Sequence, residues 1–419
     1  MDRPLSLELS GSTPIEIYEL IIYHMNSAST LKNCSLTCRA WLQASWRNLF
    51  FRRRIVVDRT NFEAFLELIE LDSRAVTIIR FIRSLHIEQG DSWLLYRSTG
   101  PRNPKPFQFD EYLPRLVGLV SVERLKLGWI RCDIGPSTIS ALRDNFARVS
   151  VLELKSTVLS SSEQFLAILS SFPSLSGLVL GGFAIIGLSE MQYTNDREQT
   201  LLLRDTSPVP PNLSDLSCNL AREETIFLFS WFTLRGVESI RKLNVTLIHE
   251  SSNAVVSTYC RQFGSNLEEL TISSGAVMLP KAFDLSPCVK LTTLGINVEF
   301  RSRSTIFDAD VPLLDSFIPL INIFQTITSE SLEEVRIWLR ANGDMTKENY
   351  NQLDWDGLAS VIERPQFKNL LRFSLFAFHK HSQTVKAVLK RRIPDSAHLA
   401  SIIQVRSWGG LKRAHSDNC

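Results

Sequence analysis

An apolar residue followed by further apolar residues three and five positions later recurs ten times between residues 82 and 375. If the first residue is called x, then x+3 and x+5 point to the same side of a β-strand, because successive side chains alternate between the two faces. The ten triads are Ile82/Leu85/Ile87, Val122/Leu125/Leu127, Val149/Leu152/Leu154, Leu175/Leu178/Leu180, Leu213/Leu216/Cys218, Ile240/Leu243/Val245, Leu267/Leu270/Ile272, Leu291/Leu294/Ile296, Leu332/Val335/Ile337 and Leu370/Phe373/Leu375. The pattern predicts ten short strands, each with one buried face.

Five of the nine spacings between consecutive triads lie between 24 and 27 residues, which is the period of a leucine-rich repeat. The connectors read as helices at 137–147, 161–172, 222–232, 253–263 and 355–364. We therefore expect an α/β fold, a curved solenoid of parallel strands with helical crossovers over residues 82–378, in which stacked neighbours bury the leucines. The repeats lack an asparagine at a fixed place, so they are similar to irregular leucine-rich repeats. A plain α/β sheet of strand–helix units is the alternative.

The stretch from Thr13 to Phe50 predicts three short helices. Thr13 and Glu16 form a capping box around Pro14, which suits the first helical position. The first helix is apolar on two sides, since Ile17, Leu20 and Ile21 share one face and Ile15, Tyr18, Ile22 and Met25 share another. Such a helix needs two surfaces to bury against. One is the rest of this small domain, and the second is either another part of the chain or a partner protein.

Two motifs in this stretch resemble the F-box. They are Thr13-Pro14-Ile15-Glu16-Ile17 and, about twenty residues later, Cys38-Arg39-Ala40-Trp41. The family usually has leucine before the proline, where this chain has Thr13. The resemblance covers residues 10–50, and the stretch is similar to F-box proteins of mushroom-forming fungi. It divides the chain into an F-box (10–50), a helical connector (51–81), the repeats (82–378) and a C-terminal tail (379–419).

The resemblance implies a partner, because F-box domains bind the Skp-type adaptor of cullin–RING ubiquitin ligases. Carried over by motif, the expected adaptor contacts are Pro14, Ile15, Ile17, Leu20, Ile21, Leu31, Cys38 and Trp41. The repeats would then bind a target protein, as the substrate-recognition subunit of an SCF-type ligase. Two alternatives stay open: an F-box scaffold that does not transfer ubiquitin, and a repeat protein that regulates an enzyme, such as a GTPase activator.

Target binding in a solenoid is expected on the strand face opposite the triads, at x+4 and x+6. These positions are small and polar in the middle repeats, whereas the last two repeats carry Arg336, Trp338 and Phe376. Arginine and tryptophan contribute disproportionately to interface energy, so these three residues are the candidate target site. The alternative is that the insertion at 341–357 or the tail covers the aromatic pair. The longer insertions at 88–115, 182–212 and 300–331 are further candidates for binding.

Composition narrows the class of protein. The 419 residues are 44% hydrophobic and 21% charged with a net charge of +2, which argues against a dedicated nucleic-acid surface. No apolar run approaches the ~18 residues of a membrane span, and the N-terminus lacks a signal-peptide core, so we expect an intracellular protein, cytoplasmic or nuclear.

Seven scattered cysteines without a CxxC pair indicate buried reduced thiols. His379 and His381 have no third metal ligand in view, and Arg52–Arg54 and Lys390–Arg392 read mainly as solvated corners, with an anion site or an import signal as the alternatives.

Catalytic motifs are absent from the sequence. It contains no phosphate-binding loop, no GxSxG and no HExxH. We therefore expect no enzymatic activity, no catalytic residues, no metal and no cofactor.

Overall fold

The chain forms two compact units in a computed structural model. Unit 1 comprises Met1–Gly187 with Pro210–Asn212, and unit 2 comprises Leu188–Val209 with Leu213–Cys419. The structure describes residues 14–37, 39–52, 54–70, 79–88, 109–130, 134–188, 210–274, 283–301, 318–342, 350–351, 353–392 and 401–408. Each unit is described by itself below.

Unit 1 begins with three helices, α2 (Ile15–Tyr23), α3 (Ala28–Ser35) and α4 (Arg39–Arg52), which we call the helical unit. Ser27 caps α3 by accepting a hydrogen bond from the Thr30 amide at 3.4 Å. The side chain of Asn48 on α4 donates to the carbonyls of Ile22 (2.6 Å) and Met25 (3.1 Å), which satisfies groups that the end of α2 leaves open. The predicted three short helices are therefore present in the structure.

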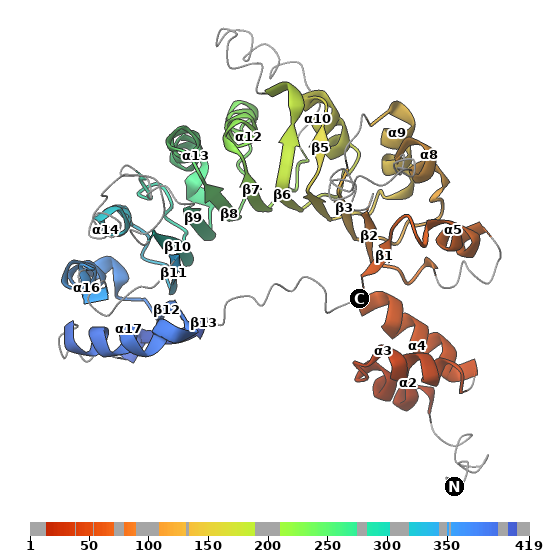
Figure 1. The fold of residues 1–419 in the computed structure, drawn as a ribbon, viewed down its shortest axis with the longest axis horizontal. Coiled ribbons are helices and arrows are strands. Elements are labelled where there is room, and N and C mark those ends of the chain that lie inside the picture. The colour runs from red at the N-terminus through yellow and green to blue at the C-terminus, as the bar shows by residue number, and fades with distance from the viewer. Residues whose placement is uncertain are drawn as a thin grey trace, which may run out of the picture. The chain divides into compact units, whose positions relative to one another are not determined.

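The rest of unit 1 is a parallel sheet in the order β1-β2-β3-β4-β6, with β5 paired to β6. The strands are β1 (Ile55–Val57), β2 (Ser84–Glu88), β3 (Arg124–Gly128), β4 (Val151–Lys155), β5 (Val158–Leu159) and β6 (Gly177–Ile185). The connectors are helices α5 (Phe62–Glu70), α8 (Phe109–Tyr112), α9 (Pro136–Asn145) and α10 (Ser162–Ser170), with 3-10 turns η1 (Leu113–Arg115) and η2 (Ile186–Leu188). These helices lie on one side of the strands (Figure 1).

Unit 2 repeats the arrangement with the strand order β7-β8-β9-β10-β11-β12-β13, again parallel. The strands are β7 (Asp215–Leu220), β8 (Lys242–Leu247), β9 (Glu269–Ser274), β10 (Thr293–Arg301), β11 (Glu334–Asn342), β12 (Arg372–Phe378) and β13 (Ile403–Trp408). The helices are α12 (Arg222–Arg235), α13 (Glu250–Phe263), α14 (Ile318–Thr326), α16 (Trp355–Ile362) and α17 (His379–Arg392), with 3-10 turns η4 (Gly264–Asn266) and η6 (Pro365–Phe367). Helices again cover one face of the sheet (Figure 1).

Every residue of the ten predicted triads is buried, and the strand registers align the triads residue for residue. Leu125 pairs with Leu152, for example, and Leu152 pairs with Leu178. One strand with its connecting helix cannot bury its own apolar face, so each repeat depends on its neighbours for a core. The parallel-strand solenoid expected from the hydrophobic pattern is confirmed.

One backbone carbonyl per repeat fixes where the next strand begins. The carbonyl of residue x+1 accepts hydrogen bonds from two consecutive amides of the following repeat, at 2.8–3.1 Å. Among the described residues this occurs at eight junctions, with the accepting residues Arg83, Glu123, Ser150, Ser214, Arg241, Glu268, Thr292 and Glu333. The junctions span connectors of very different length, so the strand register does not depend on connector length.

The sheet extends beyond the predicted repeat boundaries of 82–378 at both ends. Strand β1 lies in the predicted helical connector and pairs with β2, and β13 lies in the predicted tail and pairs with β12. The triad pattern does not identify β1 because Arg52 stands at its first position, x. It does not identify β13 because the small residue Ala400 stands at x, where the ten triads have Ile, Val or Leu. Helix α2 begins at Ile15, so Pro14 is its N-cap and not its first helical residue, and Thr13 lies outside the described residues.

Three successive repeats of unit 1 share a left-handed backbone conformation at one position. It is the residue that follows the aligned positions Gly128, Lys155 and Gly181, and we call this position the corner. Trp129 (φ 58°), Ser156 (φ 52°) and Gly182 (φ 61°) occupy these corners. The left-handed region costs a residue with a side chain about 1–2 kcal/mol, and glycine avoids that cost. The corner therefore favours glycine for its backbone conformation.

Replacing Gly182 with alanine is expected to destabilise unit 1 by about 1 kcal/mol, measured by urea unfolding. Gly181 is the matched control, because its φ is ordinary and an added Cβ would meet only Lys155 Cγ at 3.8 Å. Gly181→Ala should be neutral or slightly stabilising. Equal effects of the two substitutions would contradict the assignment of strain to the corner.

Candidate functional site

Helix α2 leaves most of its apolar side chains in solvent. Ile17, Leu20 and Ile21 are 46%, 56% and 46% exposed, and Ile15 and Tyr23 are exposed as well. In this helix only Ile22 is buried. Contiguous exposed apolar surface of this kind marks sites of association in soluble proteins. We call the exposed apolar residues Ile15, Ile17, Leu20, Ile21 and Tyr23 together the α2 face; Ile17, Leu20 and Ile21 share one side of the helix, and Ile15 lies on another.

The remaining predicted adaptor contacts have different surroundings. Leu31 is 2% exposed and forms the core of the helical unit with Ile22 and Ala44, so it stabilises this unit and presents no surface to a partner. Trp41 is half-buried against the same core, and its ring lies 5.7 Å from that of Tyr18. Pro14 is exposed at the start of α2, and Cys38 lies outside the described residues. The surface available for binding therefore comes mainly from α2.

A shallow cleft of about 310 Å³ adjoins the α2 face. It lies between α2 and α4 and is lined by Glu16, Glu19, Leu20, Tyr23, Ala44, Arg47, Asn48 and Phe51. Phe51 is itself exposed, and Leu20 and Tyr23 belong to the α2 face. Clefts with an apolar floor and a few charged groups at the rim are typical of sites that receive side chains of another protein.

The second candidate surface is the strand face of unit 2 opposite the triads. The register places its residues in rows that cross the strands. One row runs Asn244–Thr271–Gly295–Arg336–Ser374–Gln404, and the next runs Thr246–Ser273–Asn297–Trp338–Phe376–Arg406. The predicted target residues Arg336, Trp338 and Phe376 are thus brought together on neighbouring strands.

The two aromatic rings stack. The Trp338 and Phe376 centroids are 5.2 Å apart with an interplanar angle of 14°. Arg406 lies on the next strand, β13, and its guanidinium carbon is 6.0 Å from the centroid of the Phe376 ring. Next to the stack, a Cβ added at Gly295 would come within 3.0 Å of the Trp338 ring, so glycine leaves the space that the indole occupies. Both aromatic residues are half-buried.

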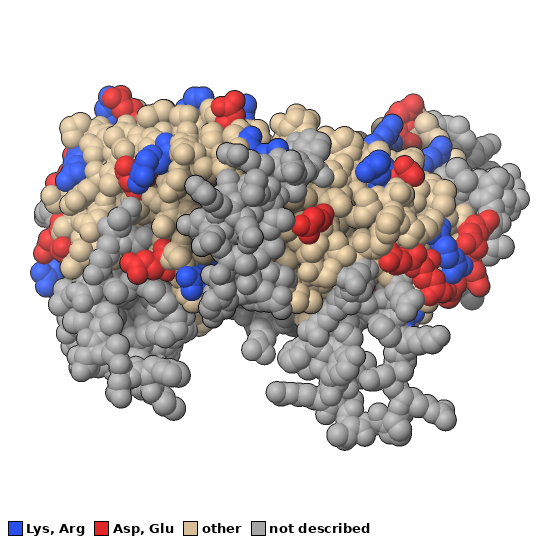
Figure 2. Space-filling view, turned by 90° about the horizontal axis from the view of Figure 1, so that it is seen from above, with Lys and Arg blue, Asp and Glu red and all other residues tan. Residues whose placement is uncertain are grey.

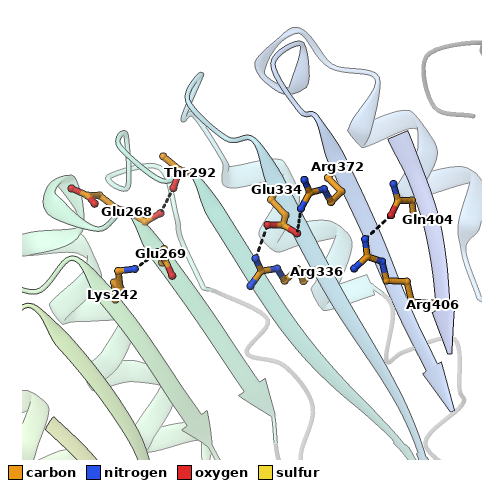
Figure 3. A network of polar contacts seen from close by, with 9 residues as sticks. All are labelled: Lys242, Glu268, Glu269, Thr292, Glu334, Arg336, Arg372, Gln404 and Arg406. Carbon is orange, nitrogen blue, oxygen red and sulfur yellow. Dashed lines mark hydrogen bonds and ion pairs between the residues drawn. The ribbon is translucent and has the colours of Figure 1, made fainter. Parts of the chain in front are cut away.

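Three arginines lie on the strands that carry the aromatic stack and on the next strand: Figure 3 shows Arg336, Arg372 and Arg406 with their polar partners. Glu334 accepts from Arg336 at 2.6 Å and lies 3.5 Å from Arg372 on β12. Arg406 donates to the neutral amide of Gln404 at 2.8 Å. Toward the middle of the unit, Lys242 and Glu269 form an ion pair across β8 and β9. Positive charge is therefore compensated in the middle strands, whereas arginines predominate at β11–β13.

The pKa of the Glu334 carboxyl is held below its usual value of 4.5, mainly by the hydrogen bond from Arg336 and against the opposing effect of burial. A lowered folded-state pKa means that the ionised form stabilises the fold. This stabilisation is fully present above the unfolded-state pKa and is lost as the pH falls through the folded-state pKa.

The melting temperature of the wild type should therefore exceed that of Glu334→Gln at about pH 7, and the difference should vanish well below about pH 4. Differential scanning calorimetry across this range measures it. Glu330→Gln removes the exposed pair with Lys368 and serves as the control, with little change expected at either pH. A Glu334→Gln difference that persists in acid would show that the carboxylate charge is not the cause.

Other predicted features gain no functional role from the structure. Cys34, Cys218, Cys260 and Cys288 are buried free thiols, and burial raises the pKa of Cys218 to about 12. His381 is buried at the start of α17, and no group of three potential metal ligands occurs among the described residues. Most of the predicted binding insertions, including Trp93 and Tyr96, lie outside the described residues. Basic and acidic side chains are interspersed over the described part of the face in Figure 2.

Membrane association by a spanning helix finds no support in the part of the chain that the structure covers. No helix there is both long enough and apolar enough to cross a bilayer.

Two contributions to the second surface were not recognised in the sequence. Gly295 is one of the small residues of the middle repeats, and its packing beside the Trp338 ring, two residues along the neighbouring strand from its aligned partner Arg336, is visible only in the structure. Arg406 was missed because β13 was not predicted. The pairing of Trp338 with Phe376 follows directly from aligning their triads, because both stand at x+6.

Comparison with known proteins does not assign the chain to a family. No protein-family model and no curated protein matches the chain. Among solved structures, the leucine-rich repeat-containing protein LegL7 from Legionella pneumophila matches with 13% identity and a TM-score of 0.41, covering 84% of this chain and 100% of that chain. The repeat architecture described here rests on the strand registers and the buried triads of the protein itself.

Proposed function

We propose that the protein is a substrate-recognition subunit of an SCF-type cullin–RING ubiquitin ligase. In this proposal the helical unit binds a Skp-type adaptor, and through it a cullin, while the repeats bind a target protein. The chain performs no chemistry of its own. It raises the effective concentration of the target near the ligase by binding both.

The observation that carries the proposal is the exposed α2 face. A small helical unit with a packed core has no internal reason to place Ile17, Leu20 and Ile21 in water, since burying each such side chain is worth about 1.5–3 kcal/mol. A partner that covers the face would recover that free energy. The F-box resemblance of residues 10–50 supplies the identity of this partner, and five exposed members of the motif-derived set, Pro14, Ile15, Ile17, Leu20 and Ile21, lie on α2 or at its start.

The target side of the proposal is supported by the strand face of unit 2. A rigid parallel sheet presents rows of side chains at fixed spacing, and the last three strands place two aromatic residues among arginines. Aromatic residues and arginine are enriched at the centres of protein interfaces.

Co-purification tests the adaptor arm. The full chain is expressed with a Skp-type adaptor and isolated by a tag on the chain, and the adaptor is expected in equal amount. Failure to retain the adaptor would favour the reading of the chain as a regulator of an enzyme. Retention of the adaptor without adaptor-dependent turnover of proteins bound to the repeats would favour the scaffold.

A further inference from the structure

We propose that the strand face at β11–β13 binds an acidic, extended peptide segment that carries apolar side chains. The site consists of the aromatic stack of Trp338 and Phe376 together with Arg336, Arg372 and Arg406. This inference rests on the proposed function, because it names the chemical class of the target that the repeats recognise.

Charge supports an acidic partner. On these three strands the proposed site carries Arg336, Arg372 and Arg406 against one carboxylate, Glu334. Glu334 is shared between two of these arginines, and its side chain is 17% exposed, so it neutralises at most one of them. Arg406 is exposed, and its hydrogen bond goes to the neutral side chain of Gln404. A carboxylate from a partner would therefore meet uncompensated positive charge and free guanidinium donors.

The aromatic stack favours a peptide over a nucleic acid. Single-stranded nucleic acids bind by laying bases on open ring faces. Here one face of Phe376 lies against Trp338, and the guanidinium of Arg406 lies 6.0 Å from the same ring. The indole of Trp338 lies against Phe376 and is also next to Gly295. The stacking contact occupies one face of each ring, so the pair offers fewer open ring faces for bases, while its half-buried apolar surface suits aliphatic side chains.

The neighbouring strands set the limit of the site. Toward β7–β9 the corresponding positions are small or polar, and the charged pair Lys242–Glu269 is internally neutralised. The exposed carboxylate of Asp215 on β7 lies beside this pair in the register, so the described charges on this part of the face sum to a net negative value and do not attract an acidic chain. Selectivity for acidic residues is therefore confined to β11–β13.

The test uses the full chain and short fluorescein-labelled peptides in which leucine alternates with glutamate, glutamine or lysine, plus an oligothymidylate of equal length. Fluorescence anisotropy should show that the glutamate peptide binds at least about 10-fold more tightly than the glutamine peptide, and that its affinity falls as salt rises. Arg406→Gln and Phe376→Ala should each weaken binding about 10-fold or more. Lys242→Gln on the same face is the matched control and should change affinity less than about 2-fold.

Equal binding of the glutamate and glutamine peptides, no binding of either peptide, or tighter binding of oligothymidylate would each overturn the proposal. So would full binding by Arg406→Gln, whose exposed side chain can be changed without disturbing the core. Arg406→Lys, which keeps the charge, should retain more affinity than Arg406→Gln. Adaptor capture is measured on the same samples. Loss of peptide binding with the adaptor retained rejects only this inference, and loss of the adaptor with peptide binding retained rejects only the ligase assignment.

Discussion

A chain carrying Ile17→Asp and Leu20→Asp should lose capture of the Skp-type adaptor, with affinity reduced at least about 100-fold. Both side chains are about half exposed in the helical unit, so the substitutions remove partner contacts without opening its core. Each buried apolar anchor at an interface is worth about 2 kcal/mol or more, and an aspartate at the same place would also have to be buried unpaired. Biolayer interferometry with immobilised adaptor measures the loss.

Two control variants distinguish a specific effect from a general one. Lys32→Ala changes an exposed polar residue of α3 in the same helical unit, outside the cleft lining, and Leu234→Asp introduces the same charge at a 51% exposed leucine of α12 in unit 2. Both should bind the adaptor within about 2-fold of the wild type. Circular dichroism should show unchanged helix content in all variants. Undiminished binding by the double variant would exclude the α2 face as the adaptor site.

Leu270→Ala is expected to destabilise unit 2 by about 2–5 kcal/mol. Leu270 is fully buried on β9, between Leu243 of β8 and Leu294 of β10, so truncation leaves a cavity that two rigid neighbours cannot close. For a unit of this size the melting temperature should fall by about 5–15 °C, measured by differential scanning fluorimetry.

The adjacent residue provides the control. Thr271 lies on the opposite face of the same strand and is half-exposed, so Thr271→Ala should cost less than about 0.5 kcal/mol. A large difference between neighbours in sequence is the direct consequence of strand alternation. Comparable losses at the two positions would mean that the triads do not define the buried face.

The repeat architecture was predictable because the physical requirement is periodic. Each strand must bury x+3 and x+5, and all thirty triad residues are buried as expected. In seven repeats the amide of residue x also donates to the carbonyl of residue x−3. In five of these repeats the residue at x−3 is a large apolar residue that is buried: Ile79, Leu119, Phe146, Phe172 and Phe367. This further apolar position lies in the sequence too, and including it would have sharpened the template.

The ends of the sheet were less predictable, because a terminal strand has a neighbour on one side only and can depart from the repeat. Arg52 and Ala400 stand where the template requires a large apolar residue, and the neighbouring strands β1 and β13 pair nonetheless. Backbone pairing with the adjacent strand, together with burial of Val57 at position x+5 of β1, places these strands without the first apolar residue.

Side-chain arrangements at the two surfaces depended on tertiary packing that no local pattern specifies. Leu31 and Ile17 look alike in the sequence, yet the first lies in the core with Ala44 and the second lies in solvent. The pairing of Glu334 with both Arg336 and Arg372 likewise requires knowing that β11 and β12 are neighbours in this register.

The carbonyl that starts each strand has a consequence for how such a protein changes over evolutionary time. Successive triads that begin at 267, 291 and 332 are separated by connectors of different length, yet both junctions use the same pair of amide hydrogen bonds. Insertions and deletions between strands are therefore structurally inexpensive, while proline at the two donating positions is prohibited. A protein built on this plan can therefore acquire longer or shorter connectors while the positions of its strands are preserved.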